Sequence, residues 1–254
     1  MSQAIAFPRA AGTTAVIDAI SNAASRTGVD FSYLLANARA ESGLDPMARA
    51  RTSSASGLFQ FTDATWLATI ARHGEKHGLG WAADALKSGA NGAVKQTILS
   101  LRQNADVAAS MAAEFTRDNA AKLEGALGRA AGSADLYLAA FFGAGGAVRF
   151  LKTMAAAPGM AAASLLPAAA AANRSTFFHA DGSARSLAEV HDLVSRRIGK
   201  FMAPAAVHTP PAAVHWPATA GSTLPPAGSA LPHSDPALTA ARARMAYLVL
   251  AAMS

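Results

Sequence analysis

Along most of the chain, apolar residues recur three or four positions apart, which is the spacing of amphipathic helices. A first helix is predicted at 13–27, and Gly28 follows its last turn as a stop signal. A second helix is predicted at 31–42, with Asp30 capping its start and Gly43 ending it. Both helices have the length and the start and stop residues that are typical of helices in globular proteins.

The same periodicity predicts further helices up to residue 202. Ser186 and Glu189 have capping-box spacing at the start of the last of them, and Ser133 is expected to cap an earlier one. An Asp-Gly pair within 177–183 predicts a short turn. The fold class is therefore all-α, with these additional helices expected: 63–77, 93–102, 104–127, 134–142, 147–156 and 187–202.

The composition changes at Ala203. Residues 203–236 are rich in Pro, Ala, Ser and Thr and carry almost no charge, which is typical of a flexible linker. A terminal amphipathic helix is predicted at 237–254, where docking back on the domain or fraying is favoured over binding to a partner or to a membrane surface. The chain thus divides into a domain at 1–202, the linker and the terminal helix.

Composition excludes several classes of binding site and catalytic site. The formal charge of +6 favours polyanions, but no dense Lys/Arg run with interleaved aromatics indicates nucleic acid. The absence of Cys excludes disulfides, thiolate zinc sites and Cys nucleophiles. The N-terminus shows no Sec-type signal peptide, and no uninterrupted apolar stretch reaches the ~18 residues of a membrane span. No transmembrane segment is expected.

Two patterns suggest a cofactor, and both are weak. His73 and His77 lie four apart on one predicted helix, but Glu does not directly follow the first His, as it does in zinc proteases. We interpret them as a solvated pair. Gly145-Gly146 is not preceded by a strand, so it is not a nucleotide fingerprint and is expected to allow a close backbone approach. Neither a metal nor a cofactor is predicted.

Candidate chemistry lies between the second and third helices. Glu41 falls in the last turn of 31–42, where the negative end of the helix disfavours a carboxylate. With partial burial, its pKa should rise by about 1–2 units, which keeps it protonated near neutral pH, as a general acid requires. A polar loop follows and ends in Gly57-Leu58-Phe59-Gln60. This arrangement indicates a cleft.

These motifs resemble those of the lytic transglycosylases that carry a soluble lytic transglycosylase domain, relatives of goose-type lysozyme. The matching parts are Glu41-Ser42 with Pro46, the segment 57–60, and the segment 140–146. The resemblance covers about residues 30–155. The third motif departs from the family, which has Tyr and Asn where this chain has Phe141-Phe142. Tyr137, one helical turn earlier, is predicted to supply the missing hydroxyl.

The resemblance implies a lysozyme-like fold that cleaves the β-1,4 bond between N-acetylmuramic acid and N-acetylglucosamine. Glu41 would act first as acid and then as base, leaving a 1,6-anhydro end. Asp45 is interpreted as a turn residue before Pro46 rather than a second carboxylate. The residues predicted to contact substrate are Ser42, Ser56, Gly57, Phe59, Gln60, Tyr137 and Phe141.

Alternatives remain open at the level of sequence. The same site can act as a hydrolytic muramidase, or the fold can be kept by a non-catalytic peptidoglycan-binding or secretion-assembly factor. A helical partner protein that works through its Pro-rich tail is a third class. The resemblance implies the periplasm or cell envelope. Because no Sec signal is visible, export through a flagellar or specialised secretion apparatus is one expectation, with a partner reached through the C-terminal tail.

Overall fold

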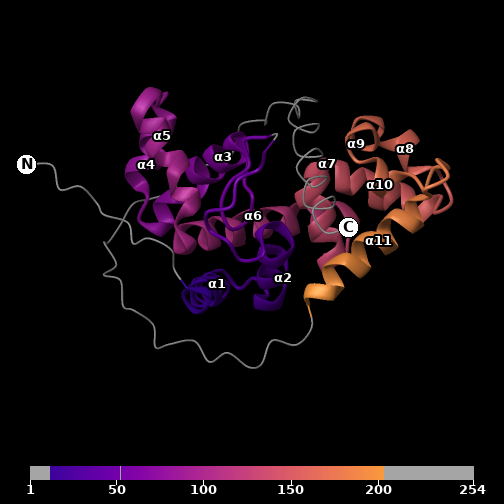
Figure 1. Ribbon diagram of the computed structural model, residues 1–254, viewed down its shortest axis with the longest axis horizontal. Coiled ribbons are helices and arrows are strands. Elements are labelled where there is room, and N and C mark those ends of the chain that lie inside the picture. The colour runs from indigo at the N-terminus through magenta and orange to yellow at the C-terminus, as the bar shows by residue number, and fades with distance from the viewer. Residues whose placement is uncertain (1–11, 52, 203–254) are drawn as a thin grey trace, which may run out of the picture.

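The computed structural model describes residues 12–51 and 53–202. The predicted linker at 203–236 and terminal helix at 237–254 lie outside the described residues. Within the described ranges the regular elements are all helical, which confirms the all-α class (Figure 1). The α-helices are α1 (Thr13–Thr27), α2 (Phe31–Ser42), α3 (Asp63–His73), α4 (Gly80–Lys87), α5 (Gly92–Ser100), α6 (Ala105–Leu127), α7 (Ser133–Ala156), α8 (Ala162–Leu165), α9 (Pro167–Ala172), α10 (Arg174–Phe177) and α11 (Leu187–Phe201).

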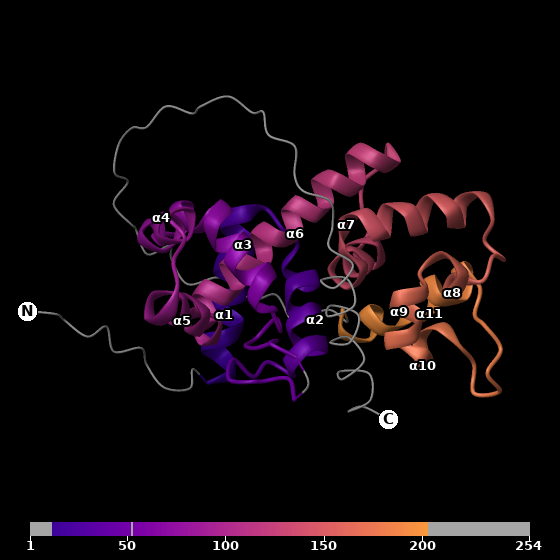
Figure 2. The same cartoon turned by 90° about the horizontal axis from the view of Figure 1, so that it is seen from above.

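The long helix α6 runs through the middle of the molecule. Figures 1 and 2 show α4 and α5 at one end of it and the short helices α8, α9 and α10 with α11 at the other. Helix α1 packs along α6, which in turn packs against α7. A single hydrophobic core extends from Val16 in α1 to Ile198 in α11. Small Ala side chains fill much of this core, and they allow the helices to approach closely.

The predicted caps of α2 and α11 are confirmed. The Asp30 carboxylate accepts a hydrogen bond from the Tyr33 backbone N–H at 2.7 Å, and Gly43 ends α2 in a left-handed conformation. Ser186 and Glu189 form a complete capping box. The prediction for Ser133 was wrong. Gly132 occupies the cap position of α7, and its N–H is satisfied by the carboxylate of Asp135 at 3.0 Å.

Helix α7 has a kink where the sequence predicted a longer interruption. Gly143 takes φ 74° and ψ 156°, and helical geometry resumes after it. Of the four residues 143–146, only Gly143 therefore departs from helical geometry. A Cβ on Gly146 would lie 2.9 Å from the Cβ of Phe142, so the close approach expected of this glycine is to its own helix.

Helix α7 is also the one described helix that is long and apolar enough to cross a membrane. Half of the stretch that meets this criterion is buried inside the protein. The helix packs against α6 and α11 and contributes Leu138, Phe142 and Phe150 to the core. These contacts are those of a core helix in a globular domain.

The region after α3 differs from the prediction. The α-helix ends at His73 and continues as a 3-10 helix, η1 (Gly74–His77), while α4 was not predicted at all. The glycines around Leu79 mark the stop correctly, but they also begin a helix of only eight residues. Another 3-10 helix, η2 (Leu101–Gln103), follows α5.

His73 and His77 are not a solvated pair, so this prediction was wrong. His73 is buried, and its Nε2 lies 2.9 Å from the Asp118 carboxylate, while His77 Nε2 lies 3.0 Å from the Glu114 carboxylate. Glu114 and Asp118 stand four apart on α6, so they match the spacing of the two histidines. The pairs link α3 and η1 to α6.

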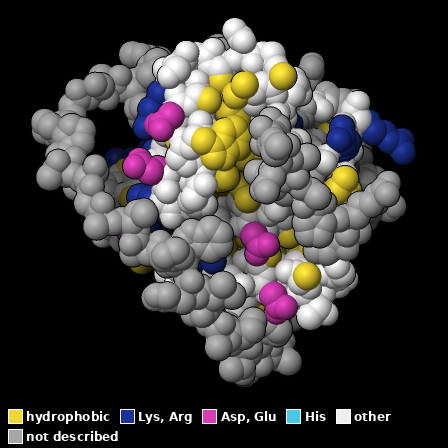
Figure 3. Space-filling view, turned by 90° about the vertical axis from the view of Figure 1, so that its left-hand side faces the viewer, with side chains coloured by type: hydrophobic (Ala, Val, Ile, Leu, Met, Phe, Trp, Pro, Cys, Tyr) yellow, Lys and Arg dark blue, Asp and Glu magenta, His cyan; other side chains and the backbone are white. Residues whose placement is uncertain are grey.

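The α4–α5 end carries exposed apolar side chains. Figure 3 views the molecule from this side and shows hydrophobic side chains gathered on the surface. Trp81 of α4 and Val94 of α5 are the large hydrophobic residues of these two helices that stay exposed. Neither helix contributes to the pocket described next.

Candidate active site

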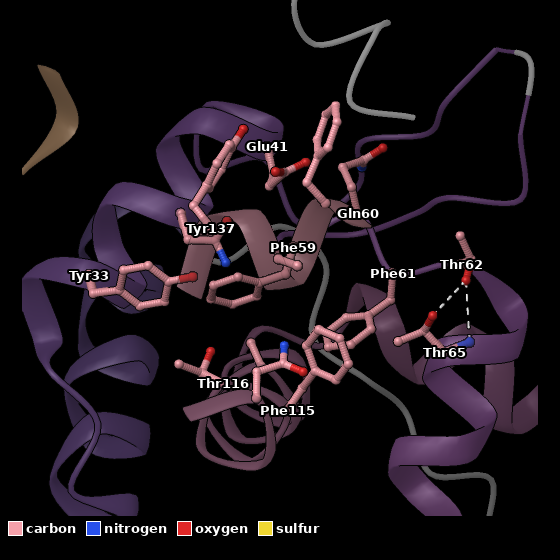
Figure 4. Close-up of a pocket in the computed structure, with 15 residues that line it drawn as sticks. Tyr33, Glu41, Phe59, Gln60, Phe61, Thr62, Thr65, Phe115, Thr116 and Tyr137 are labelled. Atoms are coloured by element: carbon pink, nitrogen blue, oxygen red, sulfur yellow. Dashed lines mark hydrogen bonds between the residues drawn. The ribbon is translucent and has the colours of Figure 1, made fainter. Parts of the chain in front are cut away.

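A pocket lies among α2, α3, α6, α7 and the loop before α3 (Figure 4). From α2 it receives Tyr33, Asn37 and Glu41, which are spaced by four and therefore share one helix face. The loop contributes residues 59–62, and α3 contributes Thr65. One wall is thus built from a region that is contiguous in sequence.

The opposite wall comes from later in the chain. Helix α6 presents Ala112, Phe115, Thr116 and Asn119 at spacings of three and four, and α7 presents Tyr137, Ala140 and Phe141 in the same way. This wall therefore combines aromatic faces with hydroxyl and amide groups. An apolar pocket with a few convergent polar groups is the usual form of a ligand site.

The structure places Glu41 in this pocket. Its side chain is partly exposed there, as expected for a helix end that opens on a cleft. Burial raises the pKa of Glu41 to about 7, while the positive charge of Arg197 in α11 acts in the opposite direction. The sequence predicted a raised pKa from partial burial at the end of α2, and desolvation by burial is the largest cause of the rise here.

Two tyrosines stand near Glu41. Burial, with the nearby carboxyl group as a further cause, raises the pKa of Tyr137 and of Tyr33 well above the usual value, so both keep their protons at neutral pH. Figure 4 shows Tyr137 beside Glu41, with the hydroxyl of Tyr33 directed into the pocket. Tyr137 thus occupies the region in which the missing hydroxyl was predicted.

Phe59, Gln60 and Phe141 also line the pocket, as predicted. Gln60 takes a left-handed backbone conformation with φ 46°. Its side-chain nitrogen donates hydrogen bonds to the carbonyls of Gly57, at 2.9 Å, and Ala48, at 3.2 Å. The loop therefore fixes the amide of Gln60, and its contact with a sugar stays a prediction.

Ser42, Ser56 and Gly57 lie outside the lining of this pocket. The Ser42 hydroxyl donates to the Leu58 carbonyl at 2.8 Å, which ties the end of α2 to the loop. Ser56 forms the bridges that fold the loop on itself. A Cβ on Gly57 would overlap the carbonyl oxygen of Arg102, so the close approach here is to protein backbone. For all three, contact with substrate stays a prediction.

Asp45 lies outside the pocket, and its carboxylate accepts a hydrogen bond from the Met47 N–H at 2.8 Å. This is the turn role expected from the sequence. Among the described residues that line the pocket, Glu41 is the only carboxylate. In the same described part of the chain, no three His, Asp or Glu side chains are arranged to hold a metal ion.

Sequence reasoning missed several polar groups of the site, including Tyr33, Thr116 and Asn119 in the pocket lining. Two more, Asn37 and Arg197, matter most for the chemistry. Asn37 is almost fully buried, and its side-chain oxygen has no hydrogen-bond partner among the described residues, although it lines the pocket. Its distance of four residues from Glu41 was a usable signal, because such a residue shares the face of α2. Arg197 gave no signal, since no motif connects α11 with α2.

The family model of the Transglycosylase SLT domain matches residues 18–91. The match includes α2 with Glu41, the loop that carries Gly57 and Gln60, and α3. It confirms the resemblance to lytic transglycosylases and the lysozyme-like character of the helical fold.

Proposed function

With the Transglycosylase SLT domain match of residues 18–91 as the premise, we propose that this protein is a peptidoglycan lytic transglycosylase. It cleaves the β-1,4 bond between N-acetylmuramic acid and N-acetylglucosamine. The observation that carries the proposal is Glu41, a single carboxyl group in an aromatic-lined pocket whose pKa burial raises to about 7. Such a group holds its proton when substrate binds and can still release it during the reaction.

In the first step, protonated Glu41 donates its proton to the glycosidic oxygen. The bond from that oxygen to the anomeric carbon of the muramic acid breaks, and the N-acetylglucosamine hydroxyl leaves. The acetamide carbonyl oxygen of the same muramic acid supports the positive charge at the anomeric carbon. The substrate thus takes the part that a second carboxylate plays in most glycosidases.

In the second step, the Glu41 carboxylate accepts the proton of the muramic acid 6-hydroxyl. The 6-oxygen then attacks the anomeric carbon and closes the 1,6-anhydro ring. Glu41 is again protonated, so the cycle is complete without water as a reactant. One residue acts as acid and then as base, which requires a pKa near the working pH.

The remaining lining residues have proposed binding roles. The unpartnered oxygen of Asn37 is suited to accept the N–H of an N-acetyl group, because a buried acceptor without a partner gains most from a ligand donor. Phe59 and Phe141 offer apolar faces to sugar rings, and Gln60 offers a polar edge. Tyr137 is proposed to orient the Glu41 carboxyl group.

A hydrolytic muramidase is the second candidate. It would use the same acid but deliver water to the anomeric carbon, usually with a second carboxylate as base or nucleophile. The lining of the pocket, in its described part, offers Glu41 alone, and this favours the substrate-assisted route. A non-catalytic wall-binding or secretion-assembly factor is favoured only by Phe141-Phe142 in place of the family Tyr and Asn.

The site of action follows from the substrate. Peptidoglycan lies in the cell envelope, so we propose that the protein works in the periplasm or envelope. We also propose that a secretion apparatus exports the protein, or that a partner binds its tail at 203–254. The positive charge of the protein, +6, would favour binding to an anionic wall polymer.

Digestion of purified peptidoglycan, followed by mass spectrometry of the fragments, tests the proposal. Wild type should release fragments with 1,6-anhydro ends, and Glu41→Gln should reduce their release by at least about a thousandfold, because it removes the one carboxyl group among the described residues that line the pocket. Glu124→Gln is the matched control, since Glu124 is exposed on α6. Reducing ends would assign a hydrolase, and equal inertness of wild type and Glu41→Gln would exclude both enzymes.

A further inference from the structure

Helix α11 lies well beyond the matched residues 18–91 and beyond all the recognised motifs. It nevertheless packs against both α2 and α7. These are the helices that carry Glu41 and Tyr137. Helix α11, which lies outside the family match, therefore contacts the helix that carries Glu41 and the helix that carries Tyr137.

From α11, Arg197 reaches this region. Its Nε and Nη2 atoms are buried and have no hydrogen-bond partner in the part of the chain that the structure describes. A buried guanidinium with unpaired donors is costly, so a residue retained only for packing should not be Arg. The groups on which its charge acts are the Tyr137 hydroxyl, through a hydrogen bond, and the Glu41 carboxyl.

We propose that Arg197 is a positioning residue of the active site, which orients the Tyr137 hydroxyl and stabilises the negative charge that Glu41 acquires when its proton leaves. This inference rests on the proposed function and extends it to α11. In the second step of the reaction the same charge keeps Glu41 ionised until the 6-hydroxyl gives up its proton. Arg197 does not line the pocket, so it acts through its two neighbours rather than on the sugar.

The other groups around Glu41 do not supply such a charge. The loop and α3 present residues 59–62 and Thr65 to the pocket, and α6 presents Ala112, Phe115, Thr116 and Asn119, none of which titrates near neutral pH. Tyr33 and Tyr137 stay protonated because burial raises the pKa of each. Arg197 is thus the charged group that opposes the effect of burial on Glu41.

The sign of the effect follows from Coulomb attraction. A positive charge near a carboxyl group favours the ionised form and lowers its pKa. Neutralising Arg197 leaves burial unopposed, so the pKa of Glu41 should rise above its value of about 7. A purely structural role for Arg197 predicts a less stable protein with no specific change at Glu41.

The test is a carbon-13 NMR titration of the Glu41 carboxyl group in the full chain, with Glu41→Gln used to assign the signal. Arg197→Gln should move the midpoint upward by about one pH unit or more. Arg197→Lys, which keeps the charge, should stay close to wild type. Arg196→Gln is the matched control, because Arg196 is the exposed neighbour on the same helix.

An unshifted midpoint in Arg197→Gln would overturn the inference, as would an equal shift in Arg196→Gln. If Arg197→Gln does not fold, Arg197→Met, which keeps the aliphatic part of the side chain, replaces it in the titration and should show the same upward shift of the Glu41 midpoint. The titration is read without substrate, so it is separate from the proposed function. A wild type that is inert on peptidoglycan would end the enzyme proposal and leave the titration result standing.

Discussion

The Glu41 carboxyl group interacts electrostatically with the hydroxyls of Tyr33 and Tyr137 and with the guanidinium of Arg197. Desolvation dominates its protonation, because burial raises its pKa although the positive charge of Arg197 lowers it. A carboxyl group balanced in this way changes its protonation state near neutral pH, which a single acid and base requires. At the scale of residues, the chemistry of the site therefore depends on neighbours from α7 and α11 as much as on α2 itself.

The hydroxyl of Tyr137 can be tested by removing one atom. Tyr137→Phe keeps the buried ring but removes the hydroxyl that interacts with Glu41. We expect kcat for peptidoglycan cleavage to fall on the order of tenfold to a hundredfold with KM nearly unchanged, since orientation of the acid is lost and binding surface is kept. Steady-state kinetics on solubilised glycan strands measure both constants.

Trp81→Phe is the control for this change, because Trp81 is an exposed aromatic residue of α4, a helix that does not line the pocket. It should leave both constants as they are. If Tyr137→Phe also cleaves at the wild-type rate, Tyr137 does not replace the hydroxyl that the third motif lacks.

Asn37 gives a prediction of opposite sign for binding and stability. Asn37→Leu removes a buried oxygen that has no partner, so the free energy of unfolding should stay level or rise by about 1 kcal/mol. The same change removes the acceptor proposed for the N-acetyl group, so KM should rise about tenfold. Chemical denaturation and kinetics together separate the two effects, and a lower stability with unchanged KM would make Asn37 a structural residue.

The sequence predicted part of this cluster. Glu41, Phe59, Gln60, Tyr137 and Phe141 were expected together, and the pocket contains all five. The motifs around them carry fixed spacings, which is why they were visible in the sequence. Asn37 and Arg197 were not predicted, because their roles depend on which helix faces meet in three dimensions.

At the scale of elements, the loop from Gly43 to Thr62 holds the pocket in shape. The Ser42 hydroxyl, in the last turn of α2, donates a hydrogen bond to the Leu58 carbonyl of this loop. The Arg102 side chain donates to the carbonyls of Ser54 and Phe61 at 2.7 and 2.9 Å. Gly57 lies against the backbone of Arg102 with φ 82°. These contacts explain why Gly57 belongs to the motif although it does not line the pocket.

Gly57→Ala should destabilise the protein by about 3 kcal/mol, because a Cβ meets backbone and the left-handed conformation disfavours alanine. Gly125→Ala is the control, since Gly125 lies in the exposed interior of α6 with open space around it. It should stabilise by up to about 1 kcal/mol. Urea unfolding of both variants measures the difference, and equal stabilities would contradict the contact with Arg102.

The helices themselves were largely predictable, and the exceptions have physical reasons. α1, α2, α6 and α11 carry long periodic runs, and their bounds agree with the sequence to within a residue or so. Side chains cap the start of α2, α6 and α11, whereas α1 begins after Gly12 without a side-chain cap. α4 has eight residues and begins at a glycine, so periodicity could not reveal it. The burial of His73 depends on carboxylates from α6, which no local pattern announces.

At the scale of the whole molecule, the pocket joins an early and a late part of the chain. Residues 18–91 provide α2, the loop and α3, whereas α6, α7 and α11 come after the matched region. The first part alone therefore lacks half of the pocket wall and the charge that acts on Glu41. An active protein should need the chain at least to the end of α11.

Truncation tests this division. Removing 203–254 should leave peptidoglycan cleavage within about twofold of wild type, because the described residues that line the pocket all lie within 33–141. Removing 187–254 should abolish cleavage, since α11 packs on α2 and α7 and carries four buried apolar residues of the core. Turbidity loss of a peptidoglycan suspension follows both. Loss of activity in the shorter deletion would instead assign the working part to the tail.

The central claim is that Glu41 acts as the protonated acid, and the pH dependence of the wild-type reaction tests it most directly. The measurement is the rate of release of 1,6-anhydro fragments from purified peptidoglycan between about pH 5 and pH 9. Because burial raises the pKa of Glu41 to about 7, the rate should fall as pH rises through that value, where the acid loses its proton. A rate that stays level through pH 7, or fragments without anhydro ends, would contradict the account.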